Sequence, residues 1–131
     1  MIGLLDSTAA VPKLGDALGY IVKDSLSSFS FNGGLYRNTP STGHQYRFDS
    51  CHSYLKEGDC VRMEVDMEST PRTVLFFVNG ESGRCFVSGI PRSVRIGFSV
   101  SGQGTSFRID RIAKQQRPTP LTPEMREITW D

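Results

Sequence analysis

The stretch that decides the fold runs from Cys60 to Gly80 and reads CVRMEVDMESTPRTVLFFVNG. Its first half alternates apolar and charged residues, with Val61, Met63, Val65 and Met67 set against Arg62, Glu64, Asp66 and Glu68. A period of two places one set on a buried face and the other toward water, which is typical of a half-exposed strand. We therefore expect a strand from Cys60 to Glu68, followed by a turn at Ser69–Arg72. On this strand Asp66 is interpreted as a solvated carboxylate or a partner of Arg72.

The second half of the stretch predicts a buried strand and a tight hairpin. Thr73–Val78 is apolar on both faces, which favours a central strand of a layered structure. Asn79-Gly80 follows, and this pair is a strong hairpin signal because both residues accept a positive φ. We expect the return strand at Arg84–Val87 and a loop at Ser88–Pro91.

Shorter strands are expected on either side of this hairpin. Downstream, Val94 to Val100 alternates, and Phe107–Arg111 alternates again as a last strand after the loop Ser101–Gly104. Upstream strand candidates are Ile2–Leu5, Leu18–Val22, Ser27–Phe31 and Leu35–Arg37. No segment carries a stripe of period 3.6 over ten or more positions. Short strands separated by turn residues predict an all-β fold, a two-sheet antiparallel β-sandwich.

The composition changes after residue 113, so we expect a sandwich domain over residues 1–113 and an extension over 114–131. Lys114–Pro123 is polar and rich in proline, which predicts an extended segment outside the core. Within it, Arg117, Pro120 and Pro123 fit the R-x-x-P-x-x-P pattern read by SH3 grooves. A stiff linker is the favoured interpretation, with SH3 contact as the alternative.

Two further features of the extension carry hypotheses. Thr119 and Thr122 each precede a proline, so proline-directed phosphorylation is a second alternative. The last residues contain Ile128 and Trp130, the only tryptophan of the chain. We expect this tip to fold back onto the domain and to cover the sheet edge left open at Met1, since an open apolar edge favours aggregation.

Composition excludes several functions and locations. The chain has 131 residues, which suits one domain, and 15 Lys and Arg against 14 Asp and Glu. Because the arginines are scattered, the sequence gives no basis for binding nucleic acid or an anionic membrane. No apolar stretch is long enough to span a membrane, and the N-terminus lacks the features of a signal peptide. Three cysteines without CxxC spacing predict reduced thiols in an intracellular, cytoplasmic protein.

Several spaced motifs together resemble the SPRY domain. They are Gly58-Asp59, the strand Val61–Asp66, Leu75-Phe76-Phe77-Val78-Asn79-Gly80, Phe86–Pro91 and Val94–Val100. Weaker likenesses upstream are Ile2-Gly3-Leu4, Leu18-Gly19 and Ser28–Phe31 followed by Tyr36, where Phe29 replaces the usual tryptophan. Family members normally carry one or more strands before the Ile-Gly-Leu element, at which this chain starts.

The resemblance implies a concanavalin-like SPRY jelly roll that binds a protein or peptide through loops at one end, without catalysis or cofactor. Tyr36 and the Val-x-Gly loop at Val100-Ser101-Gly102 match peptide-binding positions of one family branch, although Ser101 replaces a tryptophan. The loss of that indole removes a large contact surface, so the peptide specificity of that branch is not carried over. The expected partner-binding residues are Tyr36, Arg37, Asn38, Arg92, Val100, Ser101, Gly102 and Gln103.

Three other interpretations of the sequence have less support. Cys51 and His52 are adjacent, but neighbours on a strand point to opposite faces, which argues against a nucleophile–base pair. A zinc site from Cys51, His52, Cys60 and His44 fails on spacing. A carbohydrate-binding sandwich is the alternative function, but it would require acidic residues and asparagines clustered around calcium, and the sequence shows no such cluster. We therefore expect a non-enzymatic binding module.

Overall fold

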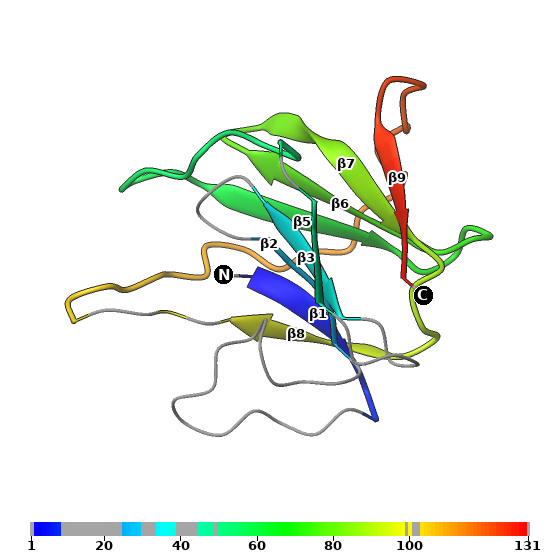
Figure 1. The fold of residues 1–131 in the computed structure, drawn as a ribbon, viewed down its shortest axis with the longest axis horizontal. Coiled ribbons are helices and arrows are strands. Elements are labelled where there is room, and N and C mark those ends of the chain that lie inside the picture. The colour runs from blue at the N-terminus through cyan, green and yellow to red at the C-terminus, as the bar shows by residue number, and fades with distance from the viewer. Residues whose placement is uncertain are drawn as a thin grey trace.

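Nine strands in two sheets make up the described part of the chain (Figure 1). The structure is a computed structural model that describes residues 2–8, 25–29, 34–38, 45–48, 50–98, 100 and 103–130. The strands are β1 Ile2–Asp6, β2 Ser25–Phe29, β3 Leu35–Asn38, β4 Gln45–Phe48, β5 Val61–Asp66, β6 Thr73–Val78, β7 Glu81–Ser88, β8 Val94–Phe98 and β9 Arg126–Thr129. None of the described segments forms a helix of the length and apolarity needed to cross a membrane.

The two sheets differ in how their strands are ordered. The five-stranded sheet has the order β4-β3-β2-β1-β8 with antiparallel neighbours, and the four-stranded sheet has the order β5-β6-β7-β9. The predicted all-β, two-sheet fold is therefore confirmed. The prediction of purely antiparallel sheets is wrong, because β9 runs parallel to β7. Parallel neighbours need a long crossover, and the chain between β7 and β9 supplies it.

The core lies between the two sheets and takes side chains from both. Leu4 and Leu35 of the five-stranded sheet belong to the same buried cluster as Val74, Phe76 and Val87 of the four-stranded sheet. The remaining buried members of the cluster are Cys51, Cys85, Ile90, Ile128 and Trp130. One shared core thus joins the two layers that Figure 1 shows.

The central strands β5 and β6, and the turn that joins β6 to β7, match their predictions. Val61, Met63 and Val65 pack against the core, while Arg62 on the opposite face is exposed. The next strand, β6, is buried on both faces and lies between β5 and β7. Asn79 and Gly80 have φ values of 50° and 85°, and Val78 pairs with Glu81 directly across them. This is the two-residue hairpin that Asn-Gly predicts.

One asparagine and two aspartate side chains fix the turns at the two ends of β6. Asn79 Nδ2 donates to Asp59 Oδ1 at 2.8 Å, and Asn79 Oδ1 accepts from Cys60 N at 2.9 Å. At the other end, Asp66 Oδ1 accepts from the backbone N–H groups of Glu68 and Ser69, both at 3.0 Å. These bonds hold the pKa of the Asp66 carboxyl below its usual value, with the bond from Ser69 as the main cause.

Asp66 is half-exposed, as a solvated carboxylate would be, and the described contacts do not pair it with Arg72. Its carboxylate accepts from the turn that follows β5. Arg72 instead holds the loop after β7, since its Nε donates to the Ile90 carbonyl at 3.0 Å and its own carbonyl accepts from Gly89 N at 2.8 Å.

A bulge in β7 receives the segment that follows β4. The β6–β7 register shifts between Leu75 and Phe77, so that three residues of β7, Gly83 to Cys85, face the one residue Phe76. Arg84 N donates to the Cys51 carbonyl at 2.7 Å. A Cβ on Gly83 would lie 2.9 Å from that same carbonyl oxygen, so the close approach requires glycine.

Cys51 and Cys85 form a disulfide at this bulge, so the prediction of reduced cysteines is wrong for these two. Their Cα atoms are 5.0 Å apart, and both side chains are buried. The pairing joins residues 34 positions apart, and sequence spacing gives no sign of it. Cys60 is free and exposed. The expected cytoplasmic location rested in part on reduced cysteines; it stays a prediction.

The strand expected at Phe107–Arg111 is absent. Residues 105–115 are described without strand or turn structure and are exposed. Alternation shows that a segment can bury one face, but it does not supply a neighbouring backbone for a ladder. Here Phe107 stacks on Phe98 of β8, with ring centroids 4.8 Å apart, and contributes a side-chain contact alone.

The C-terminal tip folds back as expected. Ile128 and Trp130 are only 2% and 7% exposed and belong to the core. Trp130 N donates to the Ser88 carbonyl at 2.8 Å, which continues the β7–β9 ladder. The edge that the tip covers is that of β7. The first strand needs no such cover, because β1 lies between β2 and β8.

The upstream strands are partly as predicted. Ile2–Leu5, Ser27–Phe31 and Leu35–Arg37 correspond to β1, β2 and β3, with small differences in bounds. Gln45–Phe48 forms β4, which the sequence did not indicate, and the candidate at Leu18–Val22 lies outside the described residues.

Candidate functional site

The expected partner-binding residues lie on two elements of the five-stranded sheet. Tyr36, Arg37 and Asn38 belong to β3, and Arg92 lies two residues before the start of β8. Val100 and Gln103 follow β8 and are exposed, as is Arg92. Ser101 and Gly102 lie outside the described residues. The structure therefore describes the backbone position of six of the eight predicted residues.

The strand register separates these residues along the sheet. At one end of β8, Val94 pairs with Asp6 of β1, and at the other end Phe98 pairs with Ile2. Through the pairings of β2, Ile2 lies level with Leu35 of β3 across the sheet. Asn38 and Arg92 therefore belong to one end of the sheet, while Val100 lies beyond the other. Eight residues of extended chain between Arg92 and Val100 span roughly 26 Å. A single loop surface does not bring both together, and a partner touching both would lie along β8.

The edge strand β8 carries an exposed apolar surface next to Val100. Val94 packs against the core, and Ile96 and Phe98 share its face of the strand. Ile96 is nevertheless 51% exposed. We call the exposed apolar side chains here the apolar margin; they are Ile96, Phe98, Val100, Phe107, Ile109 and Ile112.

A second surface is the outer face of the four-stranded sheet, which the proline-rich segment crosses. We call Lys114–Pro123 the strap. A hollow of about 390 Å³ lies between the strap and the sheet. Its lining comprises Asp66, Ser69, Thr70, Pro71, Thr73, Phe86, Pro118, Thr119, Pro120, Leu121 and Glu127. Because Pro120 lines this hollow, the SH3-type contact predicted for Arg117, Pro120 and Pro123 competes with docking of the strap.

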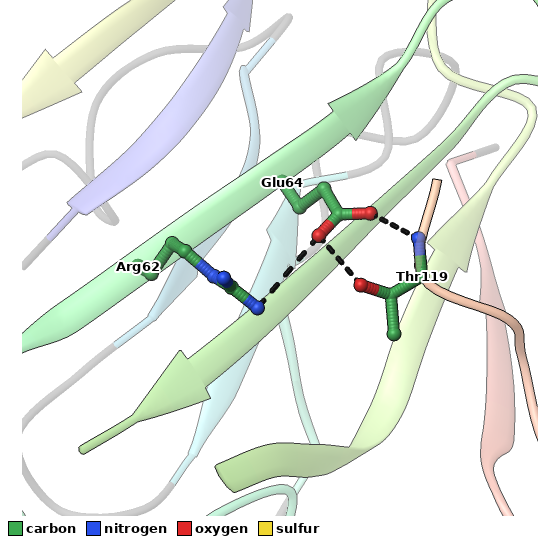
Figure 2. A network of polar contacts seen from close by, with 3 residues as sticks. All are labelled: Arg62, Glu64 and Thr119. Carbon is green, nitrogen blue, oxygen red and sulfur yellow. Dashed lines mark hydrogen bonds and ion pairs between the residues drawn. The ribbon is translucent and has the colours of Figure 1, made fainter. Parts of the chain in front are cut away.

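Glu64 of β5 anchors the strap to the sheet (Figure 2). Its Oε1 accepts from Thr119 N at 2.5 Å, and its Oε2 accepts from Thr119 Oγ1 at 2.8 Å. Arg62 Nη2 lies 3.8 Å from Oε2, and the same guanidinium lies over the ring of Phe77 at 3.8 Å from its centroid. The sequence places Glu64 on the polar face, yet its side chain is only 11% exposed because the strap covers it.

Sequence reasoning missed this contact, although one signal was available. Leu75 and Phe77 project from the outer face of β6 and are buried there. A strand that is apolar on both faces needs cover on both sides. The second cover is a neighbouring charged side chain, Arg62, together with the strap.

The sulfur of Cys51 is bonded to Cys85, so the Cys51–His52 pair holds no free thiol. Burial lowers the pKa of His52 from its usual value of about 6.5, against smaller raising effects of bonds to the backbone of Ser53 and Gly34. Among the residues that the structure describes, no three His, Cys, Asp or Glu side chains gather in a way that would hold a metal ion.

Comparisons of this chain with protein-family models, with curated proteins and with solved structures gave no match. The function is therefore argued from the two surfaces alone, the apolar margin and the strap-covered face.

Proposed function

We propose that this chain is a non-enzymatic protein-binding module of the SPRY type, with a concanavalin-like arrangement of its two sheets. The ordered motifs from Gly58 to Val100 support the family assignment. The apolar margin is the observation that carries the function. Ile96 and Phe98 lie on β8 and Val100 follows it, Phe107 stacks on Phe98, and Ile109 and Ile112 follow in the chain. Clustered apolar exposure of this kind marks interaction sites more often than bare surface.

The partner that best fits the apolar margin is an extended peptide segment with alternating apolar residues. Among the strands that the structure describes, β8 is the last in its sheet order and has a strand neighbour on one side only, β1. A peptide that adds to an edge gains main-chain hydrogen bonds, and its alternate side chains gain apolar contacts. Ile96 and Phe98 project from one face of β8 at the spacing that such a peptide matches.

This proposal moves the binding surface relative to the sequence expectation. Val100, Gln103 and Arg92 flank β8 and remain part of the surface, as its two ends. Tyr36, Arg37 and Asn38 lie on β3, which β2 and β1 separate from β8. Their role stays a prediction that the same experiment tests.

Selection of peptides by display on the full chain, followed by calorimetric titration, tests the proposal. We expect the double variant Ile96→Thr, Ile109→Thr to weaken binding of the selected peptides about tenfold or more, since a few apolar anchors dominate such contacts. Leu121→Thr is the matched control, because Leu121 is an exposed apolar residue of the strap. Full affinity in the double variant, or equal loss in the control, would overturn the proposal. Loss in Tyr36→Ala, Arg37→Ala alone would return the site to β3.

A further inference from the structure

The strap contains two Thr-Pro dipeptides in different environments. Thr119 is half-buried and bonded to Glu64, whereas Thr122 is exposed. Both have the threonine-before-proline sequence that a proline-directed kinase requires. The chain thus carries a matched pair in which only one hydroxyl holds the strap in place.

We propose that Thr119 is a phosphorylation site and that its phosphorylation releases the strap from the outer face of the four-stranded sheet. A proline-directed kinase and ATP supply the phosphoryl group. A bond forms between Thr119 Oγ1 and the γ-phosphorus of ATP, and the bond from that phosphorus to the departing ADP oxygen breaks. The hydroxyl proton passes to a base of the kinase. The inference does not depend on the apolar margin, which lies on the other sheet.

The modification removes one of the two hydrogen bonds between Thr119 and Glu64. Thr119 Oγ1 donates its hydrogen to Glu64 Oε2, and a phosphate ester at that oxygen has no hydrogen to donate. The phosphate instead adds a charge of about −1.5 to −2 beside a carboxylate. The phosphate on Thr119 and the carboxylate of Glu64 repel each other. This repulsion weakens the remaining bond from Thr119 N to Glu64 Oε1.

The charges around the hollow favour release over recapture. Asp66 and Glu127 line the same hollow, so the phosphate faces further carboxylates. Arg62 is the cation beside Glu64, at 3.8 Å from Oε2. Its single positive charge already offsets the charge of Glu64, and its guanidinium lies over the Phe77 ring. Arg62 therefore does not also neutralise a phosphate that carries almost two negative charges.

The strap is suited to reach a kinase. Residues 114–123 contain no strand, and Pro118 and Pro120 on either side of Thr119 are exposed. Because few contacts hold this segment, it opens locally without unfolding the sheets. Release uncovers Phe86 and Pro71 in the hollow and frees the proline-rich sequence for external contacts.

Phosphorylation of the full chain tests the inference. Wild type, Thr119→Ala and Thr122→Ala are treated with a proline-directed kinase and ATP, and the modified residue is mapped by mass spectrometry. Amide hydrogen exchange is then followed at Thr119, which is well isolated because Pro118 and Pro120 have no N–H. We expect phosphate at Thr119 to speed this exchange roughly tenfold or more, as for loss of a bond to a charged group. In the Thr119→Ala variant, phosphate at Thr122 should leave amide exchange at residue 119 unchanged.

A charge reversal sharpens the same experiment. In Glu64→Lys the unmodified strap is loosely held, and phosphate at Thr119 should slow the exchange, because it now faces a cation. Glu64→Gln is the milder variant, in which phosphate should have a smaller effect than in wild type. No phosphate at Thr119, or unchanged or slower exchange in the phosphorylated wild type, would overturn the inference. Faster exchange in phosphorylated Glu64→Lys would do so too.

Discussion

At β7 the four-stranded sheet is continued by β9, whereas β8 is the last described strand of the five-stranded sheet. The β7 edge has a ladder partner, a buried indole and a disulfide beside it. The β8 edge has a stacked phenylalanine and a row of exposed apolar side chains. A closed edge needs both a hydrogen-bonding backbone and apolar cover, and the C-terminal tip supplies both to β7. The apolar margin is left for a partner.

The largest effect is expected where the covered edge is broken. Trp130→Ala removes a buried side chain from the core at β7, and a change of this kind lowers the free energy of unfolding by about 3 to 5 kcal/mol. Urea unfolding followed by circular dichroism measures the loss. Leu121→Ala, at an exposed position of the strap, should change it by about 0.5 kcal/mol or less. Equal unfolding midpoints for Trp130→Ala and wild type would show that β9 does not cover the edge.

The same edge makes a spectroscopic prediction. Trp130 is the only tryptophan, so native fluorescence reports its environment alone. We expect an emission maximum well short of the value in water, shifting to longer wavelength when urea unfolds the chain. A water-like maximum in the native protein would contradict the burial of the tip.

The next effect concerns the link between the bulge of β7 and the segment after β4. Cys51→Ala, Cys85→Ala removes a cross-link over 34 residues, which lowers stability by about 4 kcal/mol on the loop-closure model. Wild type in reductant should lose a similar amount, and Cys60→Ala, at an exposed free cysteine, should lose almost nothing. Equal stability of oxidised and reduced wild type would count against the disulfide.

A smaller effect is expected from pH at the neighbouring His52. Burial keeps its folded pKa below the unfolded value of about 6.5, so the unfolded chain binds a proton that the folded chain does not. The contribution of His52 is therefore fully present above pH 6.5 and is lost as the pH falls toward the folded pKa. His52→Gln should flatten the fall in urea midpoint over this range. An unchanged slope in that variant would assign the pH dependence to other groups.

The smallest effect is expected at the uncovered edge. Ile96 is half exposed, so Ile96→Thr should lower the free energy of unfolding by about 0.5 kcal/mol or less in urea. A loss as large as that of Trp130→Ala would mean that the margin is covered in solution and would weaken the proposed function.

The sequence predicted most of the four-stranded sheet because its signals are local. Alternation in β5, the two-sided apolar strand β6 and the Asn-Gly turn each depend on a few neighbouring residues. The same logic failed at Phe107–Arg111, where alternation is present but no backbone lies alongside. It also missed β4, whose four residues give too short a pattern.

The candidate site was predicted less well than the fold, since it depends on where distant strands meet. The sequence pointed to Arg92 and Val100 as parts of one loop surface, but the register of β8 against β1 sets them at opposite ends. It pointed to the strap as an extended segment, but not to its bond with Glu64, which joins residues 55 positions apart.

By itself, the sequence determined the fold class, the central hairpin and the return of Trp130 to the domain, because periodicity, turn chemistry and apolarity act at short range. Only the tertiary structure decided the partners: Cys51 with Cys85, β9 alongside β7, and Thr119 on Glu64. The physical reason is that each such contact depends on the path of the intervening chain. No local pattern encodes that path.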